Sequence, residues 1–298
     1  MTDPAAAVAL RRGVLAVSVL DDVDLVPVAD GVQLDLGPDS AARLDPDAGP
    51  DAGLGGRVPW AELAACVGPV DPESEPGRAR LRDWLRVRRY FAEMGSMAAW
   101  RVELAAVPLG LPTDHPLHPG PEWVREAVLG GAVDLGIGLR GLVSDDPDGV
   151  VALPPALTRA VGLDTSAWWT ALRVRLEDMG ALTVDRLRRD GNGLITPMGG
   201  CDVVTLLGSR ALRAFLAGSD GTGMRGVAVP MRSRGWFDLA RIDPAFVSAA
   251  AAATDEVDRG FWRPLLVTRD EVATGLPGGD VRTIVLRDPA AADVLWRL

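Results

Sequence analysis

The chain has 298 residues, a formal net charge of −10, and 48% hydrophobic and 24% charged residues, which is typical of a globular protein and not of a disordered or fibrous one. Its apolar runs fall far short of the roughly 20 residues that a membrane-spanning helix needs, and its first residues lack the basic start of a signal peptide, so we expect a soluble, cytoplasmic protein with no membrane segment. The acidic balance disfavours a general nucleic-acid-binding protein, and because every basic residue is Arg, a Lys Schiff base and a P-loop Lys are excluded.

The first quarter of the chain holds the whole acidic excess. Residues 1–76 contain 14 Asp and Glu against 4 Arg, a balance of −10, whereas residues 77–298 contain 27 acidic residues and 27 Arg. In chain order we predict a Val-rich strand over 13–20, a hairpin over 24–36 with its turn at 29–31, a loop over 37–57, a short helix over 59–66 and an acidic connection over 68–77. We place the domain boundary near residue 77. An acidic N-terminal segment, 1–76, would then precede a main domain, 77–298, and would be able to join its sheet.

Beyond residue 77, helical and strand patterns alternate. Helices are predicted over 78–94, 121–129, 164–179 with an interruption at Gly180, 202–216, 244–255 and 289–296, and strands over 101–109, 133–143, 226–231, 265–268 and 281–286. Asp243-Pro244 and Asp288-Pro289 each combine an N-cap carboxylate with Pro at the first helical position. The interspersed elements favour an α/β (or α+β) fold, a layered mixed sheet with helices, and they leave the strand order open.

The only two His residues, His115 and His118, follow Asp114 in a loop between a predicted strand and a predicted helix. Imidazole and carboxylate groups bind divalent metals, and His titrates near neutral pH, so these three residues are candidate metal ligands and catalytic residues. Each His precedes a Pro, which favours an extended backbone. Residues three apart in such a backbone lie about 9 Å apart, so the imidazoles converge on one ion only if the loop turns. The alternative is a rigid surface loop without a site.

An Arg-rich helix, residues 78–89 (RARLRDWLRVRR), is the first candidate binding element. At 100° per residue its apolar side chains form one stripe that would pack on the core, and four Arg side chains form another. The four are Arg78, Arg82, Arg86 and Arg89. This stripe would bind phosphates or an acidic partner protein, or it would pair with the acidic segment that precedes it. We favour the intramolecular pairing because the opposite charges adjoin in sequence.

A second candidate binding cluster follows the predicted strand 226–231. Arg232, Arg234 and Trp236, with Phe237 beside them, combine guanidinium groups with aromatic rings, and both types of side chain are enriched in binding surfaces. The aromatic rings would equally well cover the core. The sequence does not distinguish these two arrangements.

Two familiar motifs fail on their context. Residues 221–226 match GxGxxG, but they lie between a helix and a strand, the reverse of the dinucleotide-binding order, so no nucleotide cofactor is indicated. Residues 190–195 (DGNGLI) resemble the middle of a calcium loop, yet Arg188 and Gly199 occupy its first and twelfth ligand positions. The two cysteines are too few for a disulfide framework, and we expect buried thiols.

Three functional hypotheses follow. The preferred one is a non-enzymatic interaction or regulatory protein with another protein as partner, because the sequence lacks G-x-S-x-G, HExxH and Walker motifs. The second is a small-molecule or metal-dependent enzyme centred on Asp114, His115 and His118, with a divalent metal as its cofactor. Nucleic-acid binding through residues 78–89 ranks last because of the acidic balance. The sequence does not determine the substrate, the identity of the partner or the oligomeric state.

Overall fold

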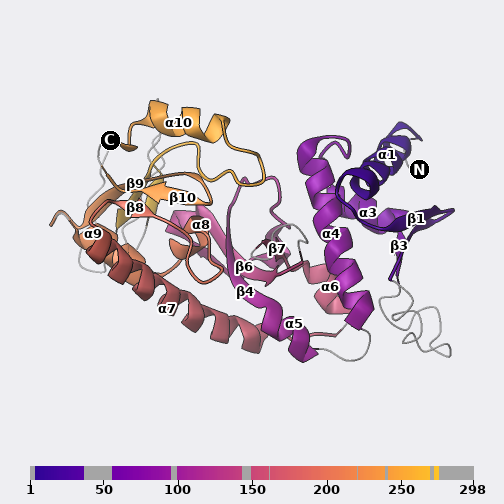
Figure 1. Cartoon of the computed structure of the whole chain (residues 1–298), viewed down its shortest axis with the longest axis horizontal. Helices are drawn as coiled ribbons and strands as arrows, with labels where there is room; N and C mark the ends of the chain where they lie inside the picture. Colours follow the sequence, from indigo (N-terminus) through magenta and orange to yellow (C-terminus); the bar gives the residue numbers. More distant parts are fainter. Residues whose placement is uncertain are drawn as a thin grey trace, which may run out of the picture. The chain divides into compact units, whose positions relative to one another are not determined.

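The fold is of the mixed α/β class, as predicted. The computed structural model describes residues 4–36, 56–94, 99–142, 149–160, 162–219, 221–238, 241–268 and 272–274. In these residues helices are interspersed with strands of three sheets (Figure 1), and the strand pairs described are antiparallel, which is the α+β form of the prediction. None of the described helices is both long enough and apolar enough to cross a membrane.

The chain divides into two compact units. The first comprises Met1–Val107, Pro116–Trp123 and Ile137–Thr170, and the second comprises Pro108–His115, Val124–Gly136 and Ala171–Leu298. Residues 1–76 thus belong to the same unit as the Arg-rich helix that follows them. The domain boundary that we place near residue 77 stays a prediction.

The first unit contains a core between helices and a small sheet. Its elements include α1 (Pro4–Leu20), β1 (Leu25–Val28), β2 (Gly31–Leu34), β3 (Arg57–Pro59), α3 (Trp60–Val67), α4 (Glu75–Met94), α5 (Ala99–Ala105), β7 (Val150–Ala152) and α6 (Pro155–Ala160). Strands β1, β2 and β3 pair in that order, so the predicted hairpin is confirmed. The helices expected over 59–66 and 78–94 are confirmed as α3 and α4. Val14 of α1, Leu63 of α3 and Leu85 of α4 are fully buried in one cluster.

The strand predicted over 13–20 is wrong, because α1 covers these residues. The buried side chains of α1 are Leu10, Val14 and Val17, and their spacing of four and three is helical. The backbone of Gly13 lies so close to Pro72 that a Cβ at position 13 would be 2.5 Å from the Pro72 carbonyl oxygen. Packing of one helical face therefore outweighs the strand preference of a Val-rich segment.

The second unit is organised on a five-stranded sheet. Its elements include β5 (Glu126–Val128), η3 (Leu129–Gly131), α7 (Ser166–Asp190), β8 (Leu194–Ile195), α8 (Val203–Leu206), α9 (Arg210–Gly218), β9 (Met224–Met231), β10 (Arg234–Trp236), α10 (Pro244–Ala252), β11 (Leu265–Thr268) and β12 (Val272–Thr274), and the sheet order is β12-β11-β9-β10-β8. Figure 1 shows α10 above this sheet and α9 below it. Val227, Ala228 and Val229 in the central strand are all fully buried, since both faces of the sheet are covered. The predicted strands at 226–231 and 265–268 are confirmed as β9 and β11.

A third sheet has the order β4-β6-β5, with β7 paired to β6. Strand β6 (Val133–Arg140) confirms the prediction over 133–143. The strand predicted over 101–109 is wrong in its first half, because α5 precedes β4 (Ala106–Pro112). The helix predicted over 121–129 is also wrong. After the single turn η2 (Pro121–Trp123), the buried Trp123 donates its indole N–H to Ile137 O at 2.9 Å, and the chain then forms β5.

Two helix predictions in the second unit need correction. Gly180 does not interrupt α7, which runs unbroken from Ser166 to Asp190. The single helix expected over 202–216 is two helices, α8 and α9, and Ser209 caps the second by accepting the N–H of Leu212. The helix predicted after Asp243 is confirmed as α10, and the Asp243 carboxylate caps it by accepting a hydrogen bond from the N–H of Ala245. Residues 281–296, with the second Asp-Pro pair, lie outside the described residues.

Candidate functional site

The His loop has no gathered set of metal ligands around it. Asp114 is exposed, whereas His115 is only 4% exposed. His118 accepts the backbone N–H of Gly120 at Nδ1 (3.0 Å), and its ring meets the ring of Trp123 edge-on at 5.5 Å. No group of three His, Cys, Asp or Glu side chains able to hold a metal ion occurs in the part of the chain that is described. The metal and catalytic roles of this loop stay predictions, and the geometry adds no support to them.

The Arg stripe of α4 is engaged in ion pairs within the first unit. These pairs include Arg78–Glu75 (2.5 Å), Arg82–Asp21 (2.9 Å) and Arg89–Glu93 (2.7 Å). Arg82 and Asp21 have side chains only 17% and 19% exposed. Burial disfavours the charged form of Arg82, but Asp83 and Asp21 outweigh it and raise its pKa. Arg86 is half-buried. The intramolecular pairing is thus present. Glu75, at the start of α4, comes from the acidic connection over 68–77, whereas Asp21 follows α1 and Glu93 lies near the end of α4 itself.

The cluster after β9 separates into residues with different roles. Arg232 pairs with Asp202 at 2.7 Å and donates to Val257 O at 3.3 Å, so it ties loops together. Trp236 is 8% exposed and belongs to the core. Arg234 is exposed. The cluster therefore does not form one continuous binding surface by itself.

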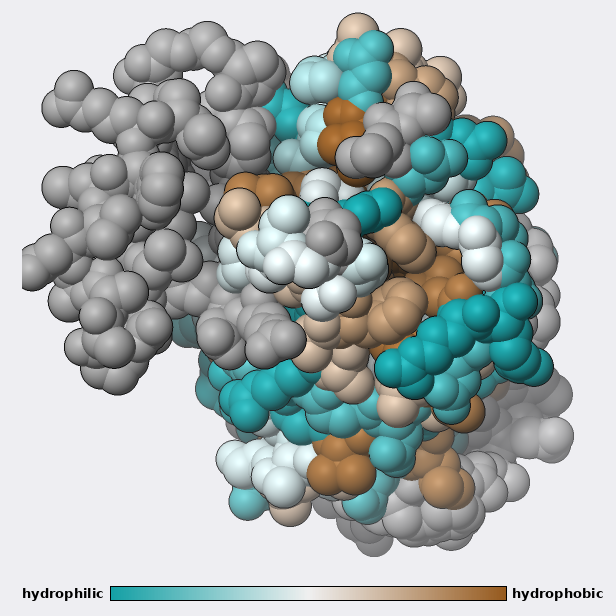
Figure 2. All heavy atoms as spheres, turned by 90° about the vertical axis from the view of Figure 1, so that its left-hand side faces the viewer, coloured by the Kyte–Doolittle hydropathy of each residue, from teal (hydrophilic) through white to brown (hydrophobic). Residues whose placement is uncertain are grey.

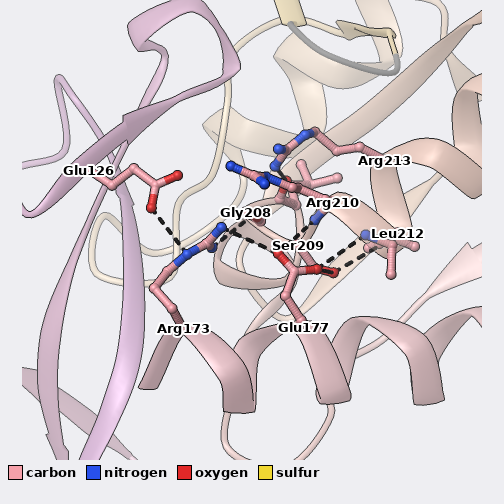
Figure 3. Close-up of polar contacts among 10 residues, drawn as sticks. Glu126, Arg173, Glu177, Gly208, Ser209, Arg210, Leu212 and Arg213 are labelled. Carbon is pink, nitrogen blue, oxygen red and sulfur yellow. Dashed lines mark hydrogen bonds and ion pairs between the residues drawn. The ribbon is translucent and has the colours of Figure 1, made fainter. Parts of the chain in front are cut away.

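A polar network surrounds Glu177 of α7 (Figure 3). The Glu177 carboxylate accepts hydrogen bonds from the Ser209 hydroxyl (2.8 Å), the Arg210 N–H (3.1 Å) and the Ala211 N–H (3.2 Å). These donors lie at the first turn of α9, where backbone N–H groups have no partner within the helix. Glu177 therefore caps α9 from a neighbouring helix.

Arg173, one turn before Glu177 on α7, extends this network to the third sheet. Its guanidinium group contacts Glu126 of β5 at 3.1 Å, Glu177 at 3.3 Å and the carbonyl oxygen of Gly208 at 3.2 Å. Three separate segments are thereby joined at one side chain. Arg213, 6% exposed, donates to Leu207 O beside them at 2.9 Å.

The Glu177 network is suited to holding helices together and not to catalysis. Burial disfavours the Glu177 carboxylate, but the bonds from Arg210, Ser209 and Ala211 and the charge of Arg173 outweigh burial and lower its pKa. A carboxylate with a lowered pKa is a poor general base. Ser209 is also fully buried, so its hydroxyl is not presented to a substrate.

The outer face of α10 is exposed but carries no charged side chain. Only Val247 and Ala251 of this helix are buried, and its sequence, PAFVSAAAA, contains no charged residue. Phe246 is 40% exposed. Trp262, 43% exposed, adjoins the helix because its carbonyl oxygen accepts the Ser248 hydroxyl at 3.0 Å. A surface helix normally places charged side chains outward, so an uncharged outer face beside two exposed aromatic rings calls for an explanation.

Guanidinium groups border these rings. Arg241 lies 5.7 Å above the ring of Trp236, which meets Phe246 edge-on at 6.0 Å. Arg259 lies 4.7 Å above the ring of Trp262. We call Phe246 and Trp262 together with the exposed residues of α10 the α10 surface. Figure 2 shows that apolar patches bordered by hydrophilic side chains occur on the side of the molecule that carries α9 and α10.

The sequence analysis does not identify this surface. Its candidate Trp236 is buried and meets Phe246 edge-on, whereas Phe246 and Trp262 lie 10 and 26 residues further along the chain and are not among the candidates. The signal available was the absence of charge over 244–253, directly after a strong N-cap. The sequence around Glu177 gives no indication that this residue caps a helix, since the groups that donate to its carboxylate belong to another helix.

No family model, no curated protein and no solved structure matches this chain.

Proposed function

We propose that the protein is a non-enzymatic interaction protein that binds another protein through the α10 surface. The observation that carries the proposal is the uncharged outer face of α10 with Phe246 and Trp262 exposed beside it. Contiguous exposed apolar area on a globular protein is typical of protein-binding sites. Aromatic and Arg side chains dominate the energy of such sites.

The cation beside the aromatic rings favours an acidic partner segment at that edge of the surface. The neighbouring carboxylates are held in contacts within the chain: Asp243 accepts the N–H of Ala245, Asp255 accepts the N–H of Val257, and Glu256 lies 3.8 Å from Arg259. Arg241 is exposed next to the aromatic rings. A partner helix with aliphatic side chains on one face and carboxylates at its border would match both features.

The test compares fluorescently labelled synthetic helices in an anisotropy titration. One peptide is amphipathic with Leu and Glu, and its control has the same apolar face with Arg in place of Glu. We expect the acidic peptide to bind more tightly. We expect Phe246→Ala together with Trp262→Ala to weaken binding by at least about 30-fold, since the loss of even one central aromatic residue of an interface costs about 2 kcal/mol.

The matched control is Leu182→Ala, which removes a large apolar side chain 49% exposed on α7 and should leave binding unchanged. Equal binding of the two peptides would contradict the preference for an acidic partner. If the double variant and the control bind alike, the α10 surface is not the binding site. The enzyme and nucleic-acid hypotheses are not carried forward, because no observation in the described residues favours either.

A further inference from the structure

A second surface with exposed apolar side chains lies in the first unit, on the outer face of α1. Val8, Leu15 and Val19 lie within about 40° of one another around the helix at 100° per residue. Their exposed fractions are 47%, 46% and 80%. The opposite face is buried in the core, so α1 presents large aliphatic side chains on both sides. We call Val8, Leu15 and Val19 the α1 face.

Charges of opposite sign flank the α1 face along the helix. Arg11 and Arg12 are exposed and interrupt the aliphatic residues in its first half. Asp22 and Asp24 are exposed just beyond its C-terminal end. Arg12 has a side chain 69% exposed, and its nearest ion-pair partner, Glu73, is 4.0 Å away, so the guanidinium group of Arg12 is available to a second molecule. The order along the helix is therefore basic, aliphatic, acidic.

We propose that the α1 face binds a second copy of this chain, with the two α1 helices antiparallel. A two-fold axis at the level of Val17 places Leu15 of one copy opposite Val19 of the other, because residues whose numbers sum to 34 then lie at the same height. The same axis brings the residues that follow the C-terminal end of α1, Asp22 among them, towards Arg12 of the other copy. A symmetric contact of this kind must be self-complementary, and the order of charges along α1 meets that requirement.

Other registers are less favourable. An axis at the level of Arg12 would pair the full length of the two helices, but it would gather Arg11 and Arg12 of both copies at the centre, where like charges repel. The contact is small, so we expect a weak, concentration-dependent dimer. This inference does not depend on the proposed function, since it concerns the other compact unit.

Sedimentation equilibrium of the full chain, at concentrations up to about 1 mM, measures the association. We expect reversible dimers, and we expect Leu15→Glu to weaken them about 100-fold or more because a charge enters the apolar centre of the contact. Leu182→Glu, at an exposed position of similar accessibility (49%) in the other unit, should not change association. A chain that remains monomeric at every concentration overturns the proposal.

A mixing experiment tests the register. Arg12→Asp alone and Asp22→Arg alone each place like charges together in both halves of the contact, and each should weaken self-association about tenfold. In a mixture of the two variants, both contacts become Asp–Arg pairs, so heterodimers should form with the affinity of the original chain. Equal association of either variant alone and of the mixture overturns the antiparallel register.

A further variant separates the effect of the Asp22 charge from any backbone strain that a substitution at this position introduces. Asp22 has a φ of 54°, a conformation that Asn adopts readily. Asp22→Asn removes the charge while keeping this backbone, and it should weaken the dimer without lowering the melting temperature of dilute protein. Undiminished association of Asp22→Asn would contradict the role of this carboxylate.

Discussion

At the residue scale, Glu177 joins two helices through its charge. Because its pKa in the folded state is lowered, its contribution to the free energy of unfolding is complete above the ordinary Glu pKa and is lost as the pH falls through the lowered value. Glu177→Gln keeps the shape but removes the charge. We expect a loss of about 1–2 kcal/mol at pH 7, and we expect the difference between the two proteins to shrink as the pH falls below the ordinary pKa of 4.5.

Urea unfolding measured at several pH values checks this expectation. The matched control is Asp185→Asn on the same helix, whose carboxylate is 67% exposed and 3.5 Å from Arg188. Exposed pairs of this kind contribute little, so the control should stay close to the original protein at every pH. A Glu177→Gln effect that is independent of pH would mean that its charge is not what holds α9.

Gly180 is a second residue whose role follows from a close approach. A Cβ at this position would lie 1.9 Å from Ser209 Oγ and 2.4 Å from its Cβ. Ala is the better helix former, but here it would force α7 away from the start of α9. We expect Gly180→Ala to lower the free energy of unfolding by about 1–3 kcal/mol, whereas Gly218→Ala, in α9 with nothing within 4 Å, should be neutral or slightly stabilising. Equal stability of the two variants in thermal melts would contradict this contact.

At the element scale, the N-cap of α10 sets the first turn that carries Phe246. Asp243 accepts the Ala245 N–H at 2.9 Å, and Pro244 begins the helix. Loss of such a cap costs about 1 kcal/mol. We expect Asp243→Ala to destabilise the protein by that amount and to weaken peptide binding at the α10 surface, because the first turn frays. Asp243→Asn should preserve both, since Asn caps equally well. Circular dichroism melts and the anisotropy titration measure the two effects.

The elements that the sequence predicted well are those with strong local signals. Asp243-Pro244 identified α10, the turn at 29–31 identified the hairpin, and the alternation over 133–140 identified β6. The failures are elements whose structure depends on distant partners. Residues 13–20 look like a strand until Val14 and Val17 are seen to pack on α4, and Gly180 looks like a helix break until Ser209 is found against it.

The same distinction applies to the candidate sites. A single stretch of sequence shows the Arg stripe of α4, but the acids that neutralise it include Asp21, 61 residues away from Arg82. Cap carboxylates such as Glu177, 32 residues from Ser209, and surfaces such as that of Phe246 and Trp262 form only when the chain folds. A pattern within one window therefore identifies candidate side chains, and their partners decide what these side chains do.

At the scale of the whole molecule, the two cysteines report on the two compact units separately. Cys66 belongs to the first unit and Cys201 to the second, and both are free thiols. Burial raises the pKa of each thiol to about 12, and the Cys66 thiol donates to Arg80 O at 3.4 Å. Because the thiolate is the reactive form, both should be inert towards a thiol reagent in the folded protein and reactive once their unit unfolds.

The variants Cys66→Ser and Cys201→Ser each leave one thiol, so thiol labelling in increasing urea reads one unit at a time. The boundaries between the units fall within β4, β6 and α7, and opening one unit therefore breaks elements that continue into the other. We expect a single cooperative transition, with the same urea midpoint for Cys66 and Cys201 once each variant's own stability is taken into account. Labelling of one thiol at a clearly lower urea concentration would show that its unit unfolds independently, and the shared elements would then not couple the two units.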